Sequence, residues 1–207
     1  MYKKLFVGLL LLLFTGLVPT SCFFKCEVPD HALLQEFSLF LSEPVRGAAP
    51  FTEPVLANGA RTIAAALFVS IGQLKYDYVS APSLQSLFAN QALAFSCPPP
   101  GRLGLKDQVE TVTLTSKGVF NGVPAGQPLD QFVRCRTYNS FTDTLEFPLD
   151  QLPTSINKRT YATDLESPVR LRISPKPLDN AQQQFELRVR LQSGKELMQT
   201  TSAIIWE

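Results

Sequence analysis

An alternation of apolar and charged residues in the last third of the chain constrains the fold more than any other feature. Residues 168–174 (PVRLRIS) alternate Val, Leu and Ile with two arginines, and residues 184–192 (QFELRVRLQ) alternate four apolar residues with one Glu and two arginines. Side chains on a β-strand point to opposite faces with a period of two residues. Both segments are therefore predicted to be strands that bury one face and expose the other.

Similar signals recur along the rest of the chain between scattered prolines and glycines. Residues 128–135 open with a proline and are expected to begin with one helical turn. Residues 145–149 form a short apolar run. Residues 193–195 (SGK) are expected to form a turn. Further strands are predicted at residues 33–41, 62–79 (broken near Gly72), 92–97, 108–115 and 196–206. This series predicts an all-β fold, an immunoglobulin-like β-sandwich of about seven or eight mainly antiparallel strands, as a single domain over residues 33–207.

The N-terminus has the layout of an export signal. Lys3 and Lys4 precede an apolar run over residues 5–18. This run is shorter than the roughly 20 residues that a membrane-spanning helix needs, and it matches the apolar core of a signal peptide. We therefore expect residues 1–21 to be a signal peptide that is removed from the mature protein.

The residues around Cys22 predict a lipid anchor. Ser21 directly precedes Cys22, as in boxes where the Cys thiol receives a diacylglyceryl group before the peptide bond ahead of it is cut. The box departs from the usual pattern because Pro19 stands where an aliphatic residue is expected. We expect acylated Cys22 to hold the protein at membrane lipid through a tether over residues 22–32. Plain secretion and a retained N-terminal anchor are the alternatives.

Three further cysteines, Cys26, Cys97 and Cys135, would then lie in an oxidising compartment. One disulfide and one free thiol is the simplest outcome. A Cys26–Cys97 bond is favoured because it would pin the tether to the sandwich, and Cys97–Cys135 is the alternative. No zinc site is predicted, since the sequence has no C-x-x-C and His31 is its only histidine.

Several short motifs resemble those of a family of uncharacterised Bacteroidota lipoproteins, which carry only a domain of unknown function. They are the Ser-Cys pair with a second Cys shortly after it, the run Ala-Phe-Ser-Cys97-Pro-Pro-Pro-Gly, the segment VTLTS at 112–116, the Pro-Ala-Gly loop at 124–126, and the final hairpin that begins at Phe185. The resemblance covers most of residues 22–207. It implies an envelope location and a sandwich fold, and it implies no site residues.

The charge balance excludes one large class of partner. The chain has 19 basic and 18 acidic residues, and loss of Lys3 and Lys4 with the signal peptide leaves a small net negative charge. A nucleic-acid binder needs a cationic surface to displace counterions, so no nucleic-acid partner is expected. Hydrophobic residues make up 45% of the chain, which is typical of a folded protein rather than a disordered one.

The sequence offers no strong catalytic motif. There is no Gly-x-Ser-x-Gly, and His31 beside Pro29 and Asp30 is expected to be a solvated or capping residue. The acids fall at expected turns and polar strand faces, and the Gly101-Arg-Leu-Gly104 loop lacks the Gly-Lys-Ser/Thr ending of a phosphate-binding loop. No enzyme activity, catalytic residue, metal or cofactor is therefore predicted.

Four arginines form the one candidate binding feature outside the N-terminus. Arg170 and Arg172 would join Arg188 and Arg190 in a basic stripe if their two strands were neighbours. Like charges facing across strands repel each other. Two outcomes are therefore expected as alternatives. Acids such as Glu186 or Glu196 interleave with the arginines and give a solvated face, or the stripe meets an anionic partner such as lipopolysaccharide, acidic glycan or phospholipid headgroups.

These observations predict a cell-envelope lipoprotein with a non-enzymatic binding or scaffolding β-sandwich. An envelope glycan or an outer-membrane protein is the expected partner, and the outer membrane is the expected location. The residues after Cys22 carry no acidic run, which favours the periplasmic face over the surface. Two alternatives stay open, an envelope glycan or peptidoglycan hydrolase, and an accessory subunit of a surface uptake or pilus-like assembly that uses an exposed strand edge.

Overall fold

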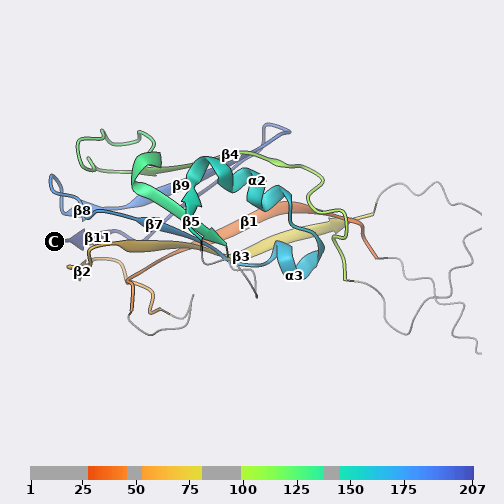
Figure 1. The fold of residues 1–207 in the computed structure, drawn as a ribbon, viewed down its shortest axis with the longest axis horizontal. Helices are drawn as coiled ribbons and strands as arrows, with labels where there is room; N and C mark the ends of the chain where they lie inside the picture. The colour runs from red at the N-terminus through yellow and green to blue at the C-terminus, as the bar shows by residue number, and fades with distance from the viewer. Residues whose placement is uncertain (1–27, 46–52, 81–98, 138–144) are drawn as a thin grey trace, which may run out of the picture. The chain divides into compact units, whose positions relative to one another are not determined.

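The fold is known from a computed structural model that describes residues 28–45, 53–80, 99–137 and 145–207. Strands dominate this part of the chain, which confirms the all-β prediction. Figure 1 shows the strands and the short helices in order of sequence. The expected strand over residues 92–97 lies outside the described residues.

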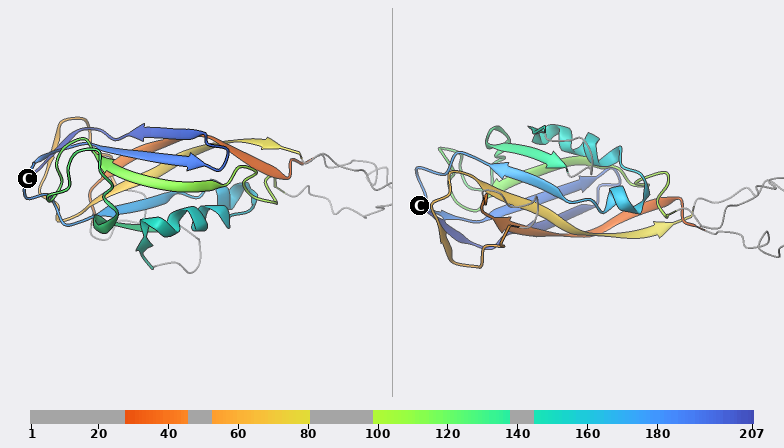
Figure 2. Two further views of the ribbon diagram at one scale, coloured as in Figure 1. Left: turned by 90° about the horizontal axis from the view of Figure 1, so that it is seen from above. Right: turned by 60° about the horizontal axis from the view of Figure 1, so that its bottom comes forward.

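Two antiparallel sheets face each other across one core (Figures 1 and 2). The first sheet contains, in spatial order, β1 (His31–Ser42), β3 (Leu67–Val79), β7 (Val169–Ile173), β5 (Val133–Thr137) and β6 (Phe147–Pro148). The second contains β10 (Glu196–Thr200), β9 (Phe185–Leu191) and β4 (Val109–Ser116). A small third sheet consists of β2 (Ala60–Thr62), β11 (Ile204–Trp206) and β8 (Gln182–Gln183), and β2 runs parallel to β11.

The strand order is that of an immunoglobulin domain. In such domains one sheet has the order A-B-E-D and the other G-F-C. Taking β1, β3, β4, β5, β7, β9 and β10 as strands A to G, the first sheet reads A-B-E-D with β6 added at its edge, and the second reads G-F-C. The predicted immunoglobulin-like sandwich is therefore confirmed at the level of strand order.

The alternating segments supply the core, as expected. Val169, Leu171 and Ile173 of β7 are buried, and four apolar residues of β9 are buried opposite them in the other sheet. At one end of the core the ring of Phe120 packs against Phe132, Phe185 and Trp206, with ring centroids 5.3–6.1 Å apart. The indole N–H of Trp206 donates a hydrogen bond to the carbonyl of Ala64 at 2.6 Å, so the buried donor is satisfied.

Two expected strands divide where the chain changes sheet. The segment predicted as 62–79 is split between β2 and β3 by residues 63–66, whereas Gly72 lies within β3. The segment predicted as 196–206 is split between β10 and β11. There the Thr201 backbone N–H donates to the Phe185 carbonyl, and its buried hydroxyl accepts the Phe185 N–H at 3.0 Å. These bonds fasten the chain to β9 at the point where it leaves one sheet for the other.

Four short helices also occur in the described part. Residues 128–135 contain the expected turn as η2 (Asp130–Phe132), which leads into β5. The connection from β6 to β7 contains η3 (Leu149–Gln151), α2 (Leu152–Asn157) and α3 (Tyr161–Leu165), of which the two α-helices were not predicted. Leu149, Leu152, Ile156 and Leu165 are buried, so this connection closes one side of the core.

The folded body begins earlier than the expected tether boundary at residue 32. The carbonyls of Pro29 and Asp30 accept hydrogen bonds from the N–H groups of Gly101 and Leu103, at 2.9 and 2.8 Å. Strand β1 then begins at His31. Residues 29–32 therefore belong to the body, which is a correction to the tether predicted over residues 22–32.

None of the helices in the described ranges is both long and apolar enough to cross a bilayer.

Candidate functional site

The four arginines of the predicted stripe do not come together. Arg170 and Arg172 lie on β7 in the first sheet, whereas Arg188 and Arg190 lie on β9 in the second. The stripe required β7 and β9 to be neighbours, and the immunoglobulin strand order separates them. The predicted single stripe is therefore wrong, and each pair of arginines has its own surroundings.

The two arginines of β9 lie among carboxylates. Arg188 pairs with Glu186 at 3.5 Å and with Glu196 at 3.8 Å, and Arg190 pairs with Glu110 of the neighbouring β4 at 3.0 Å. Lys117 also pairs with Glu186, and this contact lowers the pKa of the Glu186 carboxyl. Positive and negative charges thus alternate over this face of the second sheet.

The two arginines of β7 face two further arginines of β5. In the antiparallel register Arg170 lies opposite Arg136, and Arg172 lies opposite Arg134. Arg170 is only 7% exposed, pairs with the buried carboxylate of Glu53 at 2.6 Å, and stacks over the ring of Phe68 at 4.3 Å. Arg172 instead binds Glu146 with two hydrogen bonds, at 2.7 and 2.6 Å.

Sequence reasoning missed Arg134 and Arg136 as members of this cluster. The signal was present, because residues 133–137 (VRCRT) repeat the Arg-x-Arg spacing of the segment around Arg170. Only the strand order places β5 beside β7, and that order cannot be read from local alternation.

Cys135, the cysteine in the described part of the chain, is not placed to act as a nucleophile. Cys22, Cys26 and Cys97 lie outside the described residues, and so does the predicted Cys26–Cys97 bond. Cys135 is a free thiol on the buried face of β5. Burial raises the pKa of the Cys135 thiol to about 12, so the reactive thiolate is scarce near neutral pH.

The other residues considered for catalysis are dispersed. His31 lies half-buried at the start of β1, and Glu166 accepts a hydrogen bond from the Tyr78 hydroxyl at 2.9 Å. Within residues 28–45, 53–80, 99–137 and 145–207 no three His, Cys, Asp or Glu side chains are grouped to hold a metal ion. Three hollows in these ranges are each lined by at most one carboxylate, so none of the three brings together the pair of acids that a glycoside hydrolase uses.

The outer edge of β4 is covered at both of its ends. The side-chain amide of Asn157 accepts the Val109 N–H and donates to the Val109 carbonyl, each at 2.9 Å, and so mimics a neighbouring strand beside β4. Residues 126–129 bond to the other end of β4. The outer edge of β1 is bonded at Ala32 and Leu41, with register shifts between them. The edge of β4 is therefore closed to the addition of a partner strand.

Loops from three separate connections gather at one end of the sandwich, which we call the loop end. They are the β1–β3, β4–β5 and β7–β9 connections, joined there by the C-terminal strand β11 (Figure 1). Residues 29–31, where the folded body begins, lie at the opposite end of the sandwich (Figures 1 and 2).

Two adjoining hollows open at the loop end, with volumes of about 530 and 230 Å³. They share Asn180, Gln182 and Ala203, and amide side chains line both, beside Gly, Ala and Ile in the larger one. The first is lined by Asn58, Gly59, Asn180, Ala181, Gln182, Ala203, Ile204 and Ile205, and the second by Lys117, Gly118, Asn180, Gln182, Gln183, Gln184 and Ala203. The larger volume falls within the roughly 300–1,000 Å³ typical of ligand sites.

The loops that form these hollows are fixed to one another. The carboxylate of Asp179 accepts hydrogen bonds from the backbone N–H groups of Gly122 and Asn121, at 2.7 and 3.0 Å, and the bond from Gly122 is the main cause that lowers the pKa of Asp179. The side-chain oxygen of Asn121 in turn accepts the Leu178 N–H at 2.9 Å. A Cβ atom at Gly118 would displace the Asn180 side chain, so the β4–β5 and β7–β9 connections also pack closely at this position. The β4–β5 and β7–β9 connections are therefore pre-organised as one surface.

Large apolar side chains are exposed on the same loops. Ile63 and Leu178 are 83% and 88% exposed, and Val119 is exposed between them in the sequence. Single exposed apolar residues are common, but three on loops that are tied together and border a hollow are typical of an interaction surface. The loop end is the best candidate functional site of the described part.

A scan of protein families, a search of curated proteins and a search of solved structures each gave no match to the chain.

Proposed function

We propose that the protein is a lipoprotein of the bacterial outer membrane, held by acylated Cys22, whose immunoglobulin-like sandwich binds a partner through its loop end and has no catalytic role. An envelope glycan or an outer-membrane protein is the partner class. The observation that carries the proposal is the position of the loop end at the opposite end of the sandwich from residues 29–31.

The distance along the chain supports this arrangement. Seven residue steps separate Cys22 from Pro29, the first residue whose carbonyl is bonded to the body. Seven steps span at most about 25 Å even when fully extended. An acylated Cys22 would therefore keep the β1 start near the bilayer and direct the loop end away from it.

The chemistry of the loop end supports binding rather than catalysis. Amide groups of Asn and Gln donate and accept hydrogen bonds but do not titrate near neutral pH. Exposed Ile63, Val119 and Leu178 add apolar contact area beside them. Such a mixture suits a polar ligand with an apolar face, as glycans and protein surfaces both have.

The anchor is tested by comparing the full-length wild type with the Cys22→Ala variant. The wild type is expected in the membrane fraction, with an intact mass that exceeds the processed polypeptide by its acyl groups. The variant is expected to lose that added mass and to leave the membrane fraction.

Cys22→Ala leaves the loop end unchanged, so its circular dichroism and melting temperature serve as the fold control. Membrane retention of a folded Cys22→Ala variant with no change in mass would overturn the lipid anchor.

A further inference from the structure

Three segments of the chain are bonded together where the folded body begins. The backbone N–H groups of Gly101 and Leu103 donate to the carbonyls of Pro29 and Asp30, at 2.9 and 2.8 Å. The carbonyl of Gly101 in turn accepts the N–H of Tyr161 at 2.8 Å. The start of the body, the loop ahead of β4 and the start of α3 therefore form one surface.

Two large side chains with apolar surface are exposed there. Leu103 is 50% exposed and Tyr161 is 36% exposed. The side chain of Arg102, next to Leu103 in the chain, is 56% exposed. A Cβ atom at Gly101 would come within 2.8 Å of the Leu165 side chain, so the loop ahead of β4 packs closely against α3. We call the surface formed by Arg102, Leu103 and Tyr161 the start surface.

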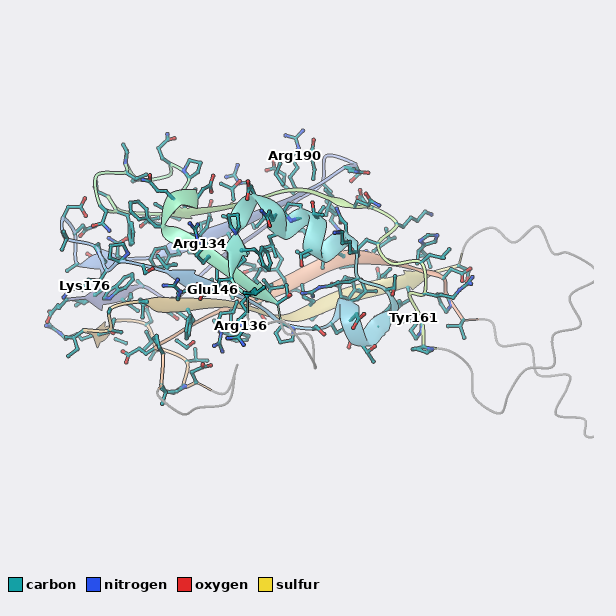
Figure 3. The ribbon with its side chains drawn as sticks, viewed as in Figure 1. Arg134, Arg136, Glu146, Tyr161, Lys176 and Arg190 are labelled. Carbon is teal, nitrogen blue, oxygen red and sulfur yellow. The ribbon has the colours of Figure 1, made fainter. Side chains whose placement is uncertain are left out.

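The backbone of Tyr161 is held in a conformation that a tyrosine rarely adopts. Its φ is 61°, in the left-handed region, where the Cβ atom of a residue other than glycine is crowded. Strained residues of this kind cluster at functional sites. Figure 3 shows Tyr161 near one end of the body and Lys176, in the β7–β9 connection at the loop end, near the other. The strained tyrosine therefore lies at the end of the sandwich that faces away from the loop end.

The chain ahead of the body indicates what the start surface meets. Seven residue steps join Cys22 to Pro29, and seven steps span at most about 25 Å. An acylated Cys22 would therefore keep the start surface within reach of the bilayer. The residue types fit that position, because tyrosine rings gather at the level of the headgroups, leucine enters the acyl boundary, and arginine keeps its charge among the headgroups.

We propose that the start surface rests on the lipid bilayer, with Leu103 at the acyl chains and Tyr161 at the level of the headgroups. This inference rests on the proposed anchor at Cys22 and adds to it a second, non-covalent contact. Acyl chains on Cys22 limit the distance between the body and the bilayer but do not set the orientation of the body. Contact through the start surface sets that orientation, with the loop end directed away from the lipid.

The test is quenching of tryptophan fluorescence by brominated lipid. The full-length protein is reconstituted in vesicles of phosphatidylcholine, with or without bromine on the acyl chains. Trp206 is the only tryptophan of the chain and is 1% exposed, so it gives an unquenched background. Leu103→Trp places a second indole on the start surface, and brominated lipid is expected to remove at least about half of the emission that this indole adds.

Leu178→Trp is the matched control, because Leu178 is 88% exposed at the loop end. The emission that it adds is expected to be the same in both kinds of vesicle. Equal quenching of the two variants, or no quenching of Leu103→Trp, would overturn the lipid contact. If the indole of Leu103→Trp is shielded from aqueous acrylamide but not quenched by lipid, protein covers the start surface instead, and the contact is again overturned.

The anchor is judged separately on the same samples, by intact mass and by flotation with the vesicles. An acylated protein that floats without quenching of Leu103→Trp overturns the contact and leaves the anchor in place. A protein without the acyl mass overturns the anchor, and quenching at position 103 still decides the contact.

Tyr161→Gly separates the lipid contact from folding. Glycine adopts a left-handed φ without strain, so the melting temperature is expected not to fall. When combined with Leu103→Trp, the same change is expected to lower the quenched fraction at least about twofold, because the ring no longer holds the surface at the headgroups. An unchanged quenched fraction would overturn the contact at Tyr161.

Discussion

Two arginines only two residues apart on β7 have different roles at the scale of the residue. Arg170 is buried over Phe68 and paired with a buried Glu53, so its charge is part of the packing of the face. Arg172 is about one third exposed and binds a carboxylate that is equally accessible. Loss of Glu53 is therefore expected to cost more stability than loss of Glu146, because breaking a buried ion pair destabilises the fold more than breaking an exposed one.

Cys135 gives a prediction about pH at the same scale. Burial raises the pKa of its thiol from 9.0 to about 12. In the unfolded chain the thiol ionises above about pH 9, whereas in the folded protein it stays protonated until about pH 12. The raised pKa therefore favours the folded state below pH 9, and this contribution is lost as the pH rises from about 9 to 12.

The measurement is alkylation with iodoacetamide at pH 8, followed by mass spectrometry of the peptide that carries Cys135. Labelling of this peptide is expected to be at least about tenfold slower in the native protein than in urea, because only the thiolate reacts. Equal labelling rates in both states would show that the Cys135 thiol is not protected.

Asn157 carries a prediction at the scale of the element. Its side-chain amide makes two hydrogen bonds to the backbone of Val109 and so replaces a neighbouring strand at the edge of β4. Asn157→Ala leaves both backbone groups of Val109 without that partner. The free energy of unfolding is expected to fall by about 2 kcal/mol, and the uncovered edge is expected to promote association of copies.

Urea denaturation and light scattering measure these two effects. Lys158→Ala is the matched control, because Lys158 is the exposed neighbour of Asn157 and loss of its side chain is expected to cost less than about 0.5 kcal/mol. Equal stability of Asn157→Ala and Lys158→Ala would contradict the edge-covering role of Asn157.

Local alternation of apolar and polar residues predicted the strands well where one face is buried and the other is exposed to solvent. The segments around Leu171 and Leu187 were found as strands because alternation is a local signal. The division of residues 196–206 was not found, because it depends on bonds between Thr201 and Phe185 in the folded state. Helices α2 and α3 were missed because segments of six and five residues are too short to show a helical period.

The candidate sites were less predictable than the elements. The Arg134–Arg172 pairing joins residues that are distant in the sequence, and only the strand order specifies it. The loop end collects amides and apolar residues from three connections, none of which is distinctive alone. Composition and local alternation carry no information on which connections meet at one end.

At the scale of the whole molecule, the sandwich would separate the two proposed roles, anchoring and partner binding, in space. The body starts at one end, where the proposed lipid anchor joins it, and the loop end lies at the other. In the described part, the edge of β4 is covered and does not offer a strand for addition. The three exposed apolar residues then become the positions at which a partner should be detected.

Site-specific photo-crosslinking in intact cells tests this arrangement. A photoreactive amino acid is placed at Leu178, which is 88% exposed on the loop end, or at Met198, which is 54% exposed on β10. A defined adduct is expected from position 178 and not from position 198, since exposure alone would label both.

Ile63→Asp in the same chain is expected to reduce the adduct from position 178 at least about fivefold, because a charge in an apolar contact must be desolvated. Adducts of equal yield from both positions, or an adduct from position 178 that Ile63→Asp leaves unchanged, would remove the loop end as the binding surface. Ile63 is 83% exposed, so its substitution is expected to leave the melting temperature unchanged and the comparison remains one of binding rather than folding.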